Sequence, residues 1–101
     1  MSSESPVQHS KPESYRVPFR VDRSAAPWYL LQNIGDQPVT GVTVTEFDSR
    51  GCAVSERGPQ RLAPGESLVF PVRSRHPEVG TIAIVRWFRR NGDEFLWRVS
   101  F

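Results

Sequence analysis

Few side chains in this sequence have the type and spacing that catalysis or metal binding needs. The two histidines, His9 and His76, are far apart, and neither has a cysteine, carboxylate or second histidine at metal-ligand spacing. Cys52 is the sole cysteine, which excludes an intrachain disulfide, and it lacks an obvious histidine base. We therefore expect no metal, no cofactor and no catalytic residue, and we predict that the protein is not an enzyme.

Two pairs of carboxylates have the residue types of general acid–base chemistry, Asp93-Glu94 and Glu46/Asp48. The first pair flanks a turn and the second runs into one, so we expect solvated turn residues rather than a catalytic pair. His76 is expected to be an exposed loop residue, and Cys52 a half-buried small residue. Glycines fall singly at turns, which excludes a phosphate-binding glycine loop.

Arginine and aromatic residues interleave in Arg86-Trp87-Phe88-Arg89-Arg90 and again in Phe95-Leu-Trp97-Arg98. Such a mixture on a sheet surface can stack bases and contact phosphates. Strand alternation, however, sends Trp87 and Trp97 away from the arginines, and nearby carboxylates neutralise part of the charge. We expect no nucleic-acid partner, and we interpret Trp28, like the other two tryptophans, as a packing residue rather than a carbohydrate platform.

Length and composition limit the classes of protein that remain. The chain has 101 residues, of which 38% are hydrophobic and 24% charged, enough for one domain with a modest core. The formal net charge of +2 is too small to imply a polyanionic partner. No apolar run approaches the ~20 residues that a membrane-spanning helix needs.

The first 14 residues differ in composition from the rest. Residues 1–14 contain one aliphatic side chain, Val7, among Ser, Pro, Glu, Gln, His and Lys, so we predict a disordered tail. They lack the basic start and apolar stretch of a secretory signal. Together with the lone cysteine, this predicts a cytoplasmic protein.

Residues 15–101 read as one all-β domain. Short apolar runs are separated by Gly, Pro, Asn and Asp about every ten residues, which is typical of antiparallel sheets. No window shows a helical apolar stripe with caps, so we expect no helix beyond a single turn. About seven or eight strands predict a β-sandwich, with a small barrel as the alternative. The expected strands are residues 15–21, 28–33, 39–47, 52–55, 67–73, 81–89 and 93–101.

The register of the C-terminal hairpin follows from one charged residue. A two-residue turn at Asn91-Gly92 pairs Arg86 with Trp97 and buries the guanidinium, which costs several kcal/mol. A three-residue loop pairs Trp87 with Phe95 and leaves the arginine outside, at the expense of ~1 kcal/mol in turn preference. We therefore predict the three-residue loop.

This register leaves an apolar outer face on the hairpin. Apolar residues rimmed by arginine are typical of protein–protein contacts. An alternative is that another loop or the N-terminal strand covers them. The expected partner-binding residues are Ile84, Arg86, Phe88, Leu96 and Arg98, with a second surface at Arg16 and Arg20 on an edge strand that Pro18 marks.

Four segments carry a family resemblance: Trp28-Tyr-Leu-Leu-Gln-Asn-Ile-Gly35, Pro38-Val-Thr-Gly-Val-Thr-Val44, Leu62-Ala-Pro-Gly-Glu66 and Ile84-Val-Arg-Trp87. The pattern resembles bacterial immunoglobulin-like domains over about residues 27–101. The resemblance implies an immunoglobulin-like antiparallel β-sandwich. It says little about function, because such sandwiches have many unrelated roles.

The combined interpretation is a non-enzymatic protein-interaction or assembly module of a bacterial cytoplasmic protein, which binds a protein partner or itself. The alternative is a ligand-binding β-sandwich that recognises carbohydrate or single-stranded nucleic acid through exposed aromatic residues and arginines.

Overall fold

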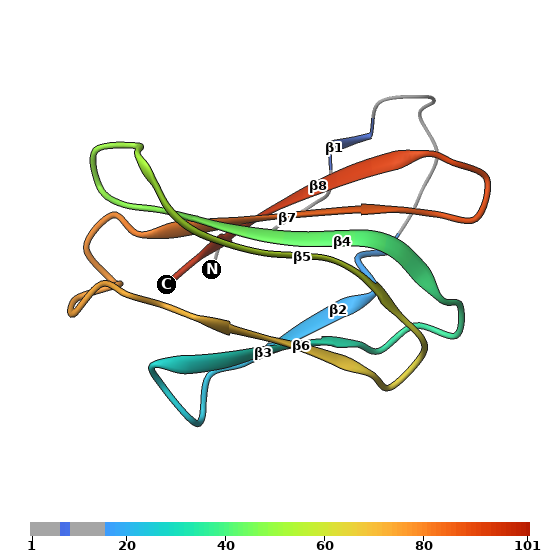
Figure 1. Cartoon of the computed structure of the whole chain (residues 1–101), viewed down its shortest axis with the longest axis horizontal. Coiled ribbons are helices and arrows are strands. Elements are labelled where there is room, and N and C mark those ends of the chain that lie inside the picture. The colour runs from blue at the N-terminus through green and yellow to red at the C-terminus, as the bar shows by residue number, and fades with distance from the viewer. Residues whose placement is uncertain (1–6, 9–15) are drawn as a thin grey trace.

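The structure, a computed structural model, describes residues 7–8 and 16–101 (Figure 1). Within this described part every regular element is a β-strand and there is no helix, so none could cross a membrane. The strands are β1 (Val7–Gln8), β2 (Phe19–Asp22), β3 (Trp28–Asn33), β4 (Val39–Phe47), β5 (Ala53–Leu62), β6 (Ser67–Pro71), β7 (Ile82–Phe88) and β8 (Glu94–Ser100).

The strands form two antiparallel sheets that face each other (Figure 1). One sheet has five strands in the order β1-β8-β7-β4-β5, and the other has three in the order β2-β3-β6. The prediction of an all-β, two-sheet fold is thus confirmed. The N-terminal tail predicted over residues 1–14 lies outside the described residues, except for β1, where Val7 pairs with Leu96.

Aromatic and branched side chains from both sheets fill the space between them. The fully buried indole of Trp87 stacks on Phe95 with ring centroids 5.6 Å apart, and Phe19 meets it edge-on at 4.9 Å from the opposite sheet. Among the described residues, neither Trp87 nor Trp97 has a hydrogen-bond acceptor for its buried indole N–H, which costs stability that the aromatic packing must offset.

The predicted hairpin register is confirmed. Trp87 pairs with Phe95 and Val85 with Trp97, while the backbone N–H of Arg89 donates to the carbonyl of Asp93 across the three-residue loop. The inward residues Val85, Trp87, Phe95, Trp97 and Val99 are all buried. The burial cost of a guanidinium therefore predicts the correct side of both strands.

Two predicted strands differ from the structure. The strand expected over residues 52–55 is much longer, because β5 continues through Gly58 and Pro59, which resemble a turn in sequence. β5 remains paired with β4 over this length, with three shifts in register. Gly58 has a φ of 97°, and its Cα lies close to the carbonyl oxygen of Val42. The strand expected over residues 15–21 starts only at Phe19 and ends at Asp22.

Candidate interaction surfaces

The outer face of the C-terminal hairpin carries all five residues that the sequence predicted there. Arg86 and Arg98 are exposed. The three apolar residues are less accessible, because Ile84, Phe88 and Leu96 are each half-buried. A shallow hollow of about 260 Å³ gathers Ile84, Arg86 and Leu96. It also brings in residues of the two neighbouring strands, namely Thr43, Thr45 and Phe47 of β4 and Glu56 of β5.

Part of this hairpin face is engaged within the molecule itself. The Arg86 guanidinium forms an ion pair with Glu94 at 3.3 Å and lies 5.5 Å from the ring centroid of Phe88. The Phe88 ring in turn packs on Gly41, where a Cβ atom would lie 2.7 Å from Phe88 Cδ2. These contacts stabilise the sheet and leave less of Arg86 and Phe88 for a partner.

A more exposed apolar surface lies on the outer face of the three-stranded sheet. We call it the Trp28 patch, and its residues are Trp28, Leu30, Val69 and Pro71. Cross-strand pairing places Trp28 opposite Pro71 and Leu30 opposite Val69. Trp28 is 49% and Val69 45% exposed, and the guanidinium of Arg57 on β5 lies 6.0 Å from the Trp28 ring centroid.

The interpretation of Trp28 as a packing residue is wrong, and the reason is the phase of β3. Tyr29, Leu31 and Asn33 face inward, so the alternate positions, including Trp28, face outward. Residues 28, 30 and 32 form one face of the strand and residues 29, 31 and 33 form the other, and both sets consist of two apolar residues followed by a polar one. No signal in the strand itself distinguishes them, and the Trp28 patch was therefore missed.

Arg16 and Arg20, predicted to share one edge strand, lie on different surfaces. β2 is an edge strand, as predicted from Pro18, and Arg20 donates to the side chain of Gln32 at 3.0 Å on the outer face of the three-stranded sheet. Arg16 precedes β2 and lines a cleft at one end of the molecule. This end cleft, of about 790 Å³, is lined by residues 16–18, 34–39 and 89–91.

The end cleft has ordered walls. The buried side chain of Asn33 donates to the carbonyls of Gln37 and Leu62 and accepts from the backbone N–H of Gly35, which fixes the turn after β3. The N–H of Ile34 donates to the Pro18 carbonyl at 2.7 Å, which ties the segment before β2 to that turn.

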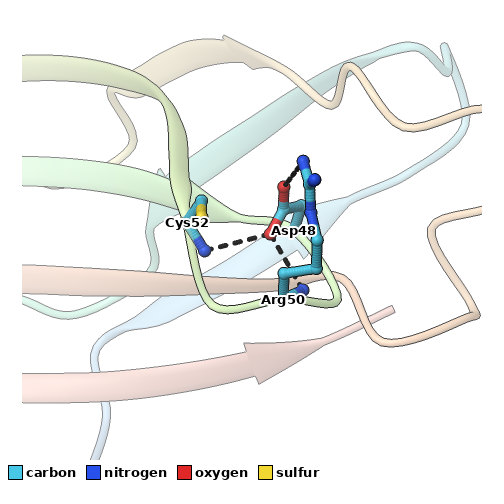
Figure 2. Close-up of polar contacts among 3 residues, drawn as sticks. All are labelled: Asp48, Arg50 and Cys52. Carbon is cyan, nitrogen blue, oxygen red and sulfur yellow. Dashed lines mark hydrogen bonds and ion pairs between the residues drawn. The ribbon is translucent and has the colours of Figure 1, made fainter.

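Asp48 organises the turn between β4 and β5 (Figure 2). Its carboxylate accepts hydrogen bonds from the backbone N–H groups of Cys52 and Arg50 and from the Arg50 side chain, at 2.9 to 3.1 Å. The Cys52 hydrogen bond, followed by that of the Arg50 side chain, lowers the pKa of Asp48 from its usual value. Asp48 is therefore a turn residue, as predicted.

Two other predictions about these residues are wrong. Glu46 is not solvated but buried, at 2% exposure, because its carboxylate accepts from the Ser55 hydroxyl and from the backbone N–H of Arg73. It thereby links β4 to the segment after β6. Cys52 is exposed rather than half-buried, because it occupies the tight turn that Asp48 caps.

His76 lies in the loop between β6 and β7, where its Nδ1 is 3.7 Å from a carboxylate oxygen of Glu78. Both side chains are mostly exposed, as expected of loop residues. Across residues 7–8 and 16–101, no group of three His, Cys, Asp or Glu side chains is placed to hold a metal ion. Comparison with protein-family models, curated proteins and solved structures finds no match for the chain.

Proposed function

We propose that this chain is a non-enzymatic protein-interaction module with an immunoglobulin-like fold, and that it binds its partner through the Trp28 patch. The observation that carries the proposal is the half-exposed Trp28 beside Val69, with Arg57 placed against its ring. Tryptophan and arginine are the residue types that contribute most to binding at protein interfaces.

The surroundings of the Trp28 patch define the partner. Arg57 on β5 supplies positive charge on one side, whereas on the other side β2 places Asp22 opposite Leu30 and Arg20 opposite Gln32. A complementary surface is apolar at its centre and carries an acidic group where it meets Arg57, because a wrong charge there is penalised. The hairpin face is the weaker candidate for the same function, since its apolar residues are half-buried and Arg86 is paired internally.

The immunoglobulin-like identity is supported by the contacts between the motif segments. The backbone N–H of Asn33 donates to the Glu66 carbonyl, and the N–H of Gly65 donates back to Asn33. The Leu-x-Asn-x-Gly and Leu-x-Pro-Gly-Glu segments thus lie against each other, as expected if the two motifs form one structural unit.

The experiment compares Trp28→Ala with Val54→Ala, a matched truncation of an exposed apolar residue on β5. Light scattering over a concentration series first measures self-association of the wild-type chain and both variants. The three proteins are then immobilised, and proteins captured from the source organism are identified and tested as purified partners. We expect Trp28→Ala to weaken one direct interaction at least about tenfold and Val54→Ala to leave it unchanged. Equal solution masses and identical captured proteins for all three chains would contradict the proposal.

The half-exposed Trp28 also favours a second function, the stacking of a carbohydrate or an unpaired base on its ring beside Arg57. Titration with cellohexaose or with a short oligothymidylate tests it directly. Ligand binding of this kind changes the fluorescence of the wild-type chain and leaves that of Trp28→Phe unchanged. A titration without any change in the wild-type signal would exclude both ligands.

A further inference from the structure

The end cleft combines positive charge with an apolar lining in a way that the proposed function does not use. Its lining includes three arginines, Arg16, Arg89 and Arg90, and one carboxylate, Asp36. The lining therefore carries an excess of positive charge. A cleft with a net positive lining concentrates ligands of negative charge.

Two of the arginines are available to a ligand. The Arg16 and Arg90 side chains are exposed, and neither forms a hydrogen bond or ion pair within the described part of the chain. The third, Arg89, is already engaged within the molecule, because its guanidinium lies 5.9 Å from the ring centroid of Phe95. Arg16 and Arg90 come from two different segments of the lining, the segment before β2 and the β7–β8 loop.

The apolar part of the lining comes from the turn after β3. Ile34 is 56% exposed, unusually high for a large aliphatic residue, and Pro18, Pro38 and Val39 also line the cleft. A ligand that matches both features carries an anionic group beside an apolar side chain. Inorganic anions satisfy only the first requirement.

The walls are held in place before any ligand arrives. Asn33 fixes one turn through three side-chain hydrogen bonds. In the β7–β8 loop, the Asn91 side chain accepts a hydrogen bond from the Asp93 N–H and donates one to the Asp93 carboxylate. Binding to such a preformed cleft has a low ordering cost.

We propose that the end cleft binds an acidic peptide segment of another protein, with Arg16 and Arg90 contacting carboxylates and Ile34 contacting an apolar side chain. The segment before β2 lines the cleft and leads into an edge strand that, within residues 7–8 and 16–101, pairs only with β3. An extended peptide can therefore continue along that edge, which favours a peptide over a small carboxylate.

The test uses the full ¹⁵N-labelled chain and a blocked pentapeptide of four glutamates around one leucine. We expect the amide signals of residues 34–37 and 89–92 to shift during titration. Arg16→Ala/Arg90→Ala is expected to weaken binding at least about tenfold. The control Arg61→Ala/Arg75→Ala removes the same charge from exposed arginines elsewhere and is expected to leave affinity within about twofold.

Several results would overturn the assignment. They are signal shifts confined to other surfaces, equal weakening in both double variants, or equal binding of a pentapeptide with lysine in place of glutamate. Phosphate alone, if it reproduced the shifts at the same concentration, would make the cleft an inorganic-anion site instead. A wild-type-like spectrum of each double variant establishes that it folds. The Trp28 patch is untouched in these variants, so this outcome is independent of the proposed function.

Discussion

The side-chain amide of Asn33 donates a hydrogen bond of 3.0 Å to the carbonyl oxygen of Leu62, 29 residues further along the chain. The same nitrogen donates to Gln37, and its partner oxygen accepts from Gly35. One fully buried amide thus joins the turn after β3 to the end of β5. Both the interior of the sheet pair and the wall of the end cleft depend on it.

Replacing Asn33 with alanine is expected to lower the free energy of unfolding by about 2–4 kcal/mol, since the buried hydrogen bond to the Leu62 carbonyl and two part-buried hydrogen bonds, to Gln37 and from Gly35, are lost. Urea denaturation measures the change. Asn91→Ala, at an exposed asparagine that also bridges within a turn, provides the control and is expected to cost less than about 1 kcal/mol. A similar loss in both variants would show that Asn33 is not a structural centre.

Gly58→Ala and Gly51→Ala separate backbone strain from steric collision. Both glycines have positive φ, 97° and 83°, which costs a non-glycine residue about 1–3 kcal/mol. A Cβ atom at Gly58 collides with the Val42 carbonyl, whereas one at Gly51 meets no atom within 4 Å. Thermal denaturation is therefore expected to show a clearly larger loss for Gly58→Ala. Equal losses would mean that β4 and β5 separate easily at this point.

The turn at Asp48 predicts a pH-dependent stability. Its pKa is lower in the folded chain, so the charged carboxylate stabilises the fold above the unfolded pKa of about 3.9. That stabilisation is lost as the pH falls through the folded pKa. Urea midpoints of wild type and Asp48→Asn are expected to differ at pH 6, and the difference is expected to shrink as the pH is lowered below the unfolded pKa. Asp36→Asn controls for net charge, and a difference independent of pH would contradict the assignment.

Iodide quenching of tryptophan fluorescence measures the exposure that the binding proposal requires. Trp87 and Trp97 are buried, and Trp28 is half-exposed, so the wild-type chain is expected to show one quenchable component. Trp28→Phe should remove this component and shift the remaining emission to shorter wavelength. Persistent quenching in Trp28→Phe would mean that a second tryptophan is accessible to solvent.

Phe88→Ala tests whether the hairpin face is structural. Its ring packs on Gly41 and beneath Arg86, so the expected loss is about 2 kcal/mol of unfolding free energy. Arg98→Ala, at an exposed residue of the same face, is expected to change stability by less than about 0.5 kcal/mol. If Phe88→Ala changes the solution mass while its urea midpoint matches that of Arg98→Ala, the hairpin face is itself a contact surface.

The sequence predicts a strand's register or inward face correctly where one of the two alternatives has a much higher free energy than the other. In the hairpin, the cost of burying Arg86 decides the register. In β3, both phases are equally apolar, and the choice depends on the distant backbone groups that Asn33 reaches. Sequence reasoning therefore placed Trp87 and Trp97 correctly and misplaced Trp28.

The candidate sites were harder to predict because their members are distant in sequence. Arg57 contacts Trp28 only because β5 and β3 belong to sheets that lie close together at one side. Similarly, Arg16 and Arg90 meet at the end cleft only once the two sheets are packed. Local patterns of charge and apolarity contain no information on such contacts.

The irregular pairing of β5 has a consequence for the behaviour of the protein at high concentration. β5 is a ten-residue edge strand, and long regular edges can serve as templates for fibrillar aggregation. Its pairing with β4 is interrupted at three places, and its longest uninterrupted stretch joins Arg57, Glu56 and Ser55 to their partners. Two of these three residues are charged. An incoming strand therefore has no long, regular, apolar stretch of β5 to pair with, which disfavours fibrillar growth along this edge.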